Sequence, residues 1–243
     1  MSAATYTRLE LRRSLRNRRF FLFSLGFPVV FYVVIVLANG RTDDFAGTGI
    51  SSALFYLTGL ASFGCMAAMI GGGARIAAER ANGWNRQLRI TPLKARTYFT
   101  SKVLVSYVIC LMTIVLLTVF AVAFGARLSV LHWLEMTALV LIGVIPFAGI
   151  GIGLGHLLSS DALGPVLGTS VGLLAFLGGT WFPVTGGLKS FSQFLPSYWI
   201  AQAAHTAVGG AAWSAFGWGV IAVWSVAGLA LAVFAYRHDT KRA

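Results

Sequence analysis

Long apolar segments alternate with short polar ones along the whole chain. Six stretches contain no Asp, Glu, Lys or Arg: residues 20–40, 45–74, 103–126, 136–160, 162–188 and 190–236. Roughly 20 apolar residues in helical form cross the hydrocarbon core of a bilayer, and a helix pairs its backbone polar groups internally. The pattern therefore predicts an all-α, polytopic membrane protein with six transmembrane helices, at residues 20–39, 53–77, 103–124, 135–157, 163–182 and 215–236.

The composition supports a membrane protein. Hydrophobic residues make up 57% of the chain and charged residues 11%, with a mean hydropathy of +0.79. A soluble domain carries about 25% charged residues. The low charge content therefore argues against a soluble globular domain.

The basic residues fall mostly on one side of the predicted spans. Of nineteen Lys and Arg residues, six precede the first span, seven lie in residues 75–102, from the end of the second span to the start of the third, and three follow the last. Cytoplasmic loops carry such an excess, so we expect both termini in the cytoplasm. The net charge of +12 is explained by this topology, because basic residues at the cytoplasmic surface interact with its anionic lipids. We therefore expect membrane lipids, and no nucleic acid, among the partners.

Residues 3–19 precede the first span and mix Leu with six Arg. Leu11 and Leu15 are four apart and share one face of a helix. This pattern is typical of an interfacial helix lying on the cytoplasmic surface. A solvated basic flank that only sets the topology is the alternative.

Residues 79–93 lie between the second and third spans and predict a short amphipathic helix. Gly83 can open that helix, and it ends before Pro92 because the residue preceding a proline avoids helical geometry. Trp84 and Leu88 are four apart and share one face. Arg80, Arg86 and Arg89 surround them. An exposed Trp and Leu suit a groove on a protein partner, and a lipid-surface helix is the alternative.

Two further segments have a distinct pattern. Residues 183–214 are too apolar for a solvated loop and are punctuated by Pro183 and Pro196, which predicts short re-entrant or interfacial helices on the outer side. In the fourth span, glycines occupy every second position from 149 to 155. Small residues four apart predict close packing between membrane helices.

Catalytic and cofactor motifs give few candidates. The chain has no GxxxxGK[ST] phosphate loop. Residues 168–172 match GxSxG around Ser170, so an intramembrane serine protease using His156 or His205 is one alternative, although a nucleophile elbow needs a strand-to-helix turn. Cys65 and Cys110 lie inside predicted spans and are expected to be buried thiols without metal-ligand spacing.

Ion-coupled transport is a second alternative. Proton and ion pathways usually contain an ionisable group deep in a span, whereas Glu135 and Asp161 lie at predicted span ends. The sequence therefore argues against an ion-coupled secondary transporter without excluding one. A purely structural membrane protein is also left open.

Three stretches together resemble a known family. They are Glu79, Gly83, Leu88 and residues 91–93 between the second and third spans; residues 177–183 (LGGTWFP) closing the fifth span; and residues 194–199 (FLPSYW) after it. In this order and spacing the chain resembles ABC-2 type permeases, the membrane subunits of bacterial exporters similar to those for daunorubicin-type drugs. The likeness covers nearly the whole chain.

The resemblance implies an ABC-2 (type V exporter-like) fold in the cell membrane and an ATP-driven exporter of a drug, lipid or other amphipathic substrate. Residues 79–93 would form the cytoplasmic coupling helix that contacts a separate ATP-binding subunit. Its contact residues would be Glu79, Gly83, Trp84, Arg86, Leu88, Arg89 and Pro92. Trp84 and Leu88 would anchor the contact, and Glu79 would be the linker contact. Trp84 departs from the family, where a less bulky residue is usual.

The resemblance also implies partners and an outer gate. Two ATP-binding subunits and a second permease chain, identical or related, would complete the transporter. ATP and Mg would bind to the partner ATPase, so no catalytic, cofactor or metal residue is expected on this chain. The outer gate segment would contain Gly178, Gly179, Phe182, Pro183, Pro196 and Tyr198.

Overall fold

A computed structural model of the chain describes residues 3–17, 22–39, 47, 49–83, 95–208 and 213–242. Within these ranges the secondary structure is helical, without a strand. The elements are α1 (Ala3–Arg16), the π-helical turn η1 (Leu22–Gly26), α3 (Phe27–Asn39), α4 (Ser52–Ala81), α6 (Ala95–Ala123), α7 (Val130–Gly143), α8 (Ile145–Leu157), α9 (Ser160–Leu177), α10 (Gly186–Ser192), α11 (Pro196–Gln202), the 3-10 helix η2 (Ala203–Val208) and α12 (Ala215–Arg242).

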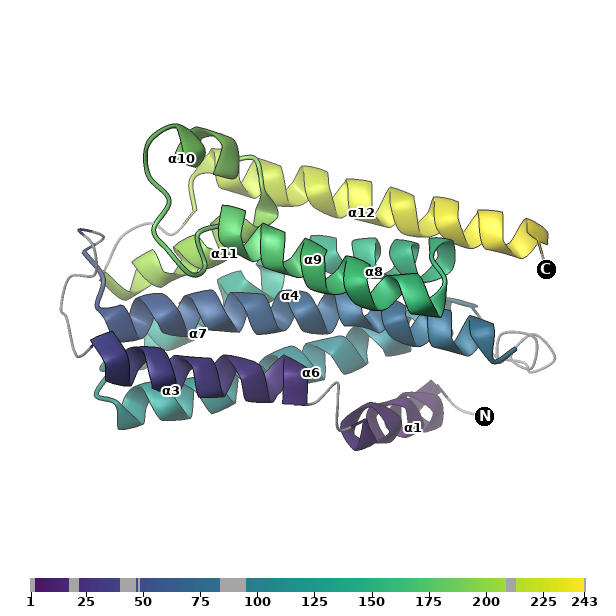
Figure 1. The fold of residues 1–243 in the computed structure, drawn as a ribbon, viewed down its shortest axis with the longest axis horizontal. Helices are drawn as coiled ribbons and strands as arrows, with labels where there is room; N and C mark the ends of the chain where they lie inside the picture. Colours follow the sequence, from purple (N-terminus) through teal and green to yellow (C-terminus); the bar gives the residue numbers. More distant parts are fainter. Residues whose placement is uncertain are drawn as a thin grey trace.

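The long helices form one elongated bundle (Figure 1). Five helices among the described residues are long and apolar enough to cross a membrane, and residues 24–38 form a shorter apolar helix beside them. The end of α4, the start of α6, helix α1 and the end of α12 lie at one end of the bundle. We call this the basic end, because Arg16, Arg80 and Arg237 lie there.

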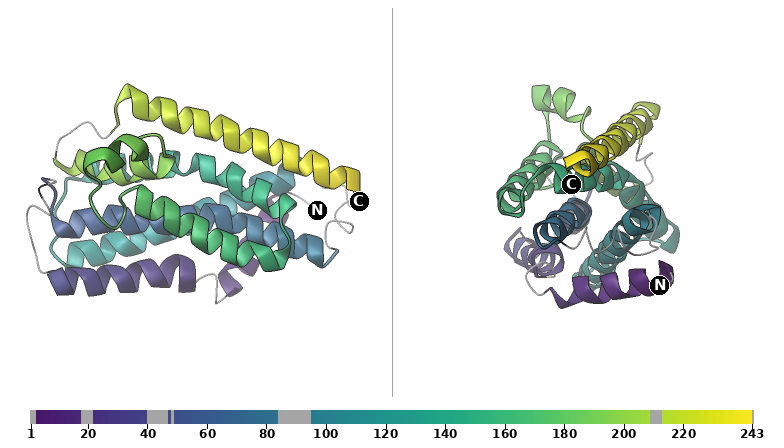
Figure 2. Two further views of the ribbon diagram at one scale, coloured as in Figure 1. Left: turned by 45° about the horizontal axis from the view of Figure 1, so that its top comes forward. Right: turned by 90° about the vertical axis from the view of Figure 1, so that its right-hand side faces the viewer.

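Helix α4 is the core of the bundle. In its most apolar window 94% of the residues are buried, and it contacts α3, α6, α8 and α9. Viewed along the bundle, it lies surrounded by the other helices (Figure 2). Cys65 of α4 faces Cys110 of α6, and both thiols are free and buried, as the sequence predicts.

The glycines of α8 allow close packing on two sides, as the sequence predicts. A side chain at Gly151 or Gly155 would collide with the backbone of α4 around Ile70 and Gly73. A side chain at Gly149 would collide with the backbone of α12 at Gly228. Because the alternating glycines point to opposite sides, α8 approaches α4 and α12 at backbone distance.

Several helices differ in length from the sequence-based boundaries. Helix α4 continues to Ala81 rather than ending at residue 77, so Glu79 and Arg80 belong to it. Helix α6 begins eight residues before the predicted third span. The predicted fourth span is present as Val130–Leu157, in which α7 and α8 together form one of the five long apolar helices. A turn at Val144 separates them, because Pro146 lacks a backbone N–H and its ring crowds the preceding turn.

The opposite end of the bundle is closed by short helices (Figure 1). Helix α9 ends at Leu177, earlier than the predicted residue 182, and a turn leads to α10 and α11. Helix α11 packs against α4, α7, α9 and α12. The segment from 183 to 208 therefore covers this end with helices too short to span a membrane.

Candidate functional site

The last turns of α4 carry the candidate site. Arg75, Glu79 and Arg80 lie there, just before the connection to α6. The helix ends because Asn82 and Gly83 turn the chain away: the N–H of Gly83 donates to the carbonyl of Arg80 at 3.0 Å, and Gly83 has a φ of 69°. Glycine adopts this left-handed conformation without the steric cost of a side chain.

Glu79 lies at the centre of a buried ionic cluster. Its Oε1 accepts hydrogen bonds from Lys102 Nζ at 2.6 Å and from Arg13 Nη1 at 3.0 Å. Its Oε2 accepts one from the hydroxyl of Tyr98 at 2.6 Å. These partners come from α6 and α1, so one carboxylate joins three helices.

A second carboxylate, Glu10 of α1, completes the cluster. Lys102 Nζ donates to Glu10 Oε1 at 2.6 Å, so one ammonium group links both carboxylates. Arg75 lies 3.9 Å from Glu10 and donates to the hydroxyls of Ser14 and Ser106. We call Glu10, Arg13, Arg75, Glu79, Tyr98 and Lys102 the Glu79 cluster.

The two carboxylates and the Lys102 ammonium of this cluster are withdrawn from solvent, whereas the side chain of Arg13 is 58% exposed. Glu79 and Lys102 are each 1% exposed, and Glu10 is 4% exposed. Removing charges from water costs several kcal/mol per ion, which only close pairing with further hydrogen bonds offsets. The short contacts supply that pairing, so the helices are held in the register that brings these groups together.

Helix α1 contributes more than its charges. Tyr6 packs against Tyr98 with ring centroids 6.3 Å apart, and Thr7 shares a hydrogen bond with Ser101. Burial, together with the nearby Glu79 and Glu10 carboxylates, raises the pKa of Tyr6 well above its ordinary value, so the hydroxyl stays neutral. Helix α1 therefore packs its polar face against α4 and α6, while Leu9 and Leu15 remain exposed.

Arg80 reaches the other side of α4. It forms an ion pair with Asp239 of α12 at 2.9 Å and donates to the carbonyls of Gly155 and Leu158, where α8 ends. The second carboxylate oxygen of Asp239 lies 2.9 Å from Nδ1 of His156. We call Arg80, His156 and Asp239 the Asp239 cluster.

Neighbouring residues on α6 join the two clusters. Tyr98 bonds Glu79, whereas Phe99 packs edge-on against His156 and against Tyr236 of α12, with ring centroids 5.8 and 5.1 Å apart. Adjacent residues of α4 and of α6 thus reach opposite sides of the bundle. One cluster therefore connects the end of α4 to α1 and α6, and the other connects it to α8 and α12.

The expected coupling helix lies largely outside the described residues. This applies to Trp84, Arg86, Leu88, Arg89 and Pro92. Gly83 follows the end of α4, where it caps that helix.

Glu79 requires a correction. The sequence-based expectation made it a contact with the ATPase, but its carboxylate is 1% exposed and bound within this chain. Its partners, Lys102, Tyr98 and Arg13, come from helices that the local sequence pattern does not connect to it.

The residues expected at the outer gate lie together at the opposite end. Gly178 ends α9 against Ser197, Gly179 has a φ of 74°, and Tyr198 is buried in α11. Pro196 is buried at the start of α11, and Phe182 is 62% exposed. The turn after α9 and the start of α11 therefore form one packed unit.

The sequence reasoning missed the partners of Glu79 and Arg80. Lys102 and Arg75 entered it only as topology-setting charges. The small number of acidic residues could have indicated these pairs. The chain has seven, and three of them, Glu10, Glu79 and Asp239, bind basic residues in these clusters. An isolated carboxylate beside an apolar span needs a partner.

The described residues offer no support for protease or metal chemistry. Residues 168–172 lie within α9, so Ser170 is not on a strand-to-helix turn. His156 is bound to Asp239. Among the described residues, no group of three or more His, Cys, Asp or Glu side chains is arranged to hold a metal ion.

Comparisons with known proteins agree with this architecture. Residues 46–236 match the family model for ABC-2 family transporter proteins. The chain is 29% identical over 207 residues to YvfS of Bacillus subtilis (strain 168), a protein named a transport permease, with 83% of each chain covered. Together with the apolar helices, these matches show that the chain belongs to the ABC-2 transporter family, as a multi-pass permease of the cell membrane.

Proposed function

We propose that the chain is the membrane-spanning subunit of an ATP-driven exporter, coupled to a separate ATP-binding subunit through residues 83–93. ATP and Mg bind to that partner and not to this chain. Family membership supports the transport role. The observation that carries the coupling is that both ionic clusters lie in the last turns of α4, which the sequence connects to residues 84–94.

The basic end faces the cytoplasm in this proposal. Sixteen of the nineteen Lys and Arg residues lie before the first span, in residues 75–102 around the connection between the second and third, and after the last. Cytoplasmic segments carry this excess. An ATP-binding subunit in the cytoplasm then meets the connection between α4 and α6.

The mechanism we propose is alternating access, with the two clusters connecting the partner's contact to the helices around α4. ATP binding and hydrolysis change the conformation of the partner, and the partner shifts the permease only by its different affinity for two permease states. Trp84 and Leu88 anchor the partner. Glu79 and Arg80 transmit the displacement to the helices on both sides of α4.

A small hollow on α4 supports an amphipathic substrate. It has a volume of about 240 Å³, lies between η1, α4 and α9, and is lined mainly by small and apolar residues such as Phe63, Ala67, Leu167 and Val171. Such a surface binds apolar groups without a fixed charge. Drugs, lipids and lipid-linked glycans all satisfy this chemistry.

The exposed face of α9 supports a second permease chain. Only 17% of its apolar window is buried in this chain. At Gly164, Gly168 and Gly172, spaced four residues apart, an added side chain would meet nothing within 4 Å. Gly164 and Gly168 also line the small hollow, so the second chain would border the substrate surface. Small residues at this spacing allow another helix to approach closely, so we place a second permease, identical or related, on this face.

The ionic clusters do not favour ion-coupled transport. They lie at the ends of the helices rather than in the middle of the spans, and their carboxylates are bound to Lys102, Arg13 and Arg80. Fixed pairs of this kind hold helices in register, whereas a proton pathway needs groups that exchange protons during transport.

A charged substitution at Leu88 tests the coupling. Leu88→Asp places a carboxylate where an apolar anchor is expected, and burying it without a partner is costly. We expect the variant to reach the membrane folded but to lose co-purification of the ATP-binding subunit. Pull-down from native membranes, with mass spectrometry of the captured proteins, measures this.

Leu188→Asp is the matched control. Leu188 is an exposed residue of α10 at the opposite end of the bundle, so its variant should retain the ATP-binding subunit. Intact co-purification with Leu88→Asp would refute the docking assignment.

A further inference from the structure

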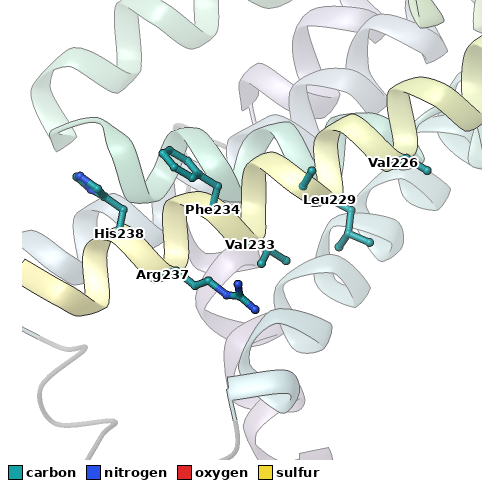
Figure 3. A pocket seen from close by; sticks show the side chains of 7 residues that line it. Val226, Leu229, Val233, Phe234, Arg237 and His238 are labelled. Carbon is teal, nitrogen blue, oxygen red and sulfur yellow. The ribbon is translucent and has the colours of Figure 1, made fainter.

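Two hollows on the helices differ in how they are built. The larger, of about 630 Å³, is lined by residues of α12 alone, from Val226 to His238, so it is the open face of one helix (Figure 3). The small hollow of about 240 Å³ has walls from three elements, with Ser24 from η1, residues 63–74 from α4 and residues 164–171 from α9. Only the small hollow therefore brings together distant parts of the chain.

Ser24 gives the small hollow a polar point. Among the described residues that line it, Ser24 is the one with a polar side chain, and the others are Phe, Leu, Val, Ala and Gly. Ser24 is 1% exposed, and no hydrogen bond joins its hydroxyl to any described residue. Native proteins rarely leave a buried hydroxyl unpaired. The hydroxyl therefore indicates a hydrogen-bonding partner that the chain itself does not supply.

The π-helical turn η1 sets Ser24 apart from a regular helical serine. A serine within a helix can donate to the carbonyl four residues earlier, as Ser62 does to Thr58 at 2.6 Å. Pro28 has no backbone N–H, so the carbonyl of Ser24 lacks its usual α-helical donor, and residues 22–26 form a π-helical turn instead. Single π-helical turns of this kind are frequent at functional sites.

The turn is packed closely against α4. A side chain at Gly64 would lie 3.1 Å from the carbonyl oxygen of Ser24, so this glycine allows η1 to approach. The neighbouring Phe63 is held between the rings of Phe27 and Trp181, with centroids 5.5 and 5.8 Å away. The hydroxyl and the aromatic wall of the small hollow thus belong to one packed unit.

The surroundings of Ser24 select the chemistry of its partner. A buried water makes about three hydrogen bonds, whereas the described lining side chains offer one polar group. None of these side chains is charged, and an unpaired charge in apolar surroundings is far less stable than a neutral polar group. A hydroxyl both donates and accepts. The best partner is therefore a neutral hydroxyl or carbonyl group attached to an apolar body.

We propose that Ser24 determines which substrates the small hollow accepts, by hydrogen-bonding a neutral hydroxyl or carbonyl group. The apolar part of the substrate then lies against Phe63 and Leu167. The hollow is smaller than the roughly 300–1,000 Å³ of sites that hold a whole small molecule, so it receives one segment of a larger substrate. This inference rests on the proposed function, because it names the chemistry of the transported molecule.

Photolabelling of the purified full-length protein in detergent tests the site without ATP or a partner subunit. The probes are an octanol that carries a diazirine and the matching octane, which differ only in the hydroxyl. Mass spectrometry measures the labelled fraction of the peptides that contain Phe63 and Leu167. Each probe is compared between variants, so its partition into the micelle cancels.

Ser24→Ala should reduce labelling by the octanol about fivefold and leave labelling by the octane unchanged. A fivefold change corresponds to about 1 kcal/mol, the net contribution of one hydrogen bond. The unfolding midpoint of Ser24→Ala without probe should equal that of the natural protein, because the hydroxyl makes no bond to the described chain.

Two further variants separate the hydroxyl from the shape of the hollow. Ser62→Ala is the matched control, since Ser62 is equally buried but already bonded to Thr58, and its labelling should be unchanged. Ala67→Leu fills the hollow and should reduce labelling by both probes. Thermal unfolding shows whether this variant is folded, and Ala67→Val provides a milder filling.

Three results would overturn the proposal. One is unchanged octanol labelling in Ser24→Ala or in the folded hollow-filling variants. Another is an equal loss of octane labelling in Ser24→Ala, which would show an effect of shape. The third is a lower unfolding midpoint for Ser24→Ala, which would assign the hydroxyl to the fold. None of these results changes the co-purification of an ATP-binding subunit, so failure here is distinguishable from failure of the proposed function.

Discussion

The two ionic clusters at the end of α4 differ in burial and in what supports them. In the Glu79 cluster, Glu79 and Lys102 are each 1% exposed and only Arg13, at 58%, reaches solvent, and the charges themselves join α1 and α6 to α4. In the Asp239 cluster, His156 is buried, but the side chains of the ion pair, Arg80 and Asp239, are 29% and 18% exposed. There the helices are already held by backbone-level packing of α8 on α4 and α12.

The comparison separates two ways of attaching a helix to α4. A buried charge without a partner destabilises the folded state by its full desolvation free energy, so buried charges must be paired. Charges at a partly exposed helix end are hydrated when a pair breaks, so they add little to packing that is already close. The attachment of α1 and α6 should therefore depend on individual charges, and the attachment of α8 and α12 should not.

The largest expected effect follows removal of the shared ammonium group. Lys102→Met leaves the Glu10 and Glu79 carboxylates without their common partner, and breaking a buried pair costs about 3–5 kcal/mol. We expect the midpoint of thermal unfolding in detergent to fall by about 10 °C. Tryptophan fluorescence during heating measures it.

Lys189→Met provides the control for this substitution. Lys189 is an exposed residue of α10, and surface changes of this kind usually stay within about 0.5 kcal/mol. Equal unfolding midpoints for Lys102→Met and Lys189→Met would contradict a stabilising role for the Glu79 cluster.

A smaller effect is expected on the other side of α4. Asp239→Asn keeps the shape of the side chain but removes its charge, so the unfolding free energy should fall by only about 1 kcal/mol after allowance for partial exposure. The difference from the natural protein should shrink in 1 M salt, where the screening length is about 3 Å. Unfolding measured at low and high salt tests both statements.

A loss with Asp239→Asn as large as that with Lys102→Met, or one insensitive to salt, would remove the distinction between the clusters. It would show that α12 is held by its terminal charge rather than by the contact between Gly149 and Gly228.

The sequence predicts the helical membrane architecture because that information is local. Span length, the excess of basic residues and the glycines of α8 are visible in short windows, and the structure confirms the packing role of those glycines. The turn at Val144 is also local, since it follows from Pro146, although the sequence-based boundary missed it.

The clusters are not local, and they were not predicted. Lys102 and Glu10 are ninety-two positions apart, and His156 and Asp239 are eighty-three apart. Without helix packing, each of these residues looks like a surface charge. The same reasoning misplaced Glu79 at a partner contact, because an acidic residue beside basic ones gives no sign of its burial.

The most direct test of the coupling proposal is a photocrosslinker at position 84. The amino acid p-benzoylphenylalanine replaces Trp84 in the full-length protein, native membranes are irradiated, and the adducts are identified by mass spectrometry. The same replacement at Phe191, which is 54% exposed on α10, is the control for the opposite end of the bundle. The account predicts a covalent adduct with an ATP-binding subunit at position 84 and none at position 191. Adducts at position 84 with membrane lipid alone would contradict it.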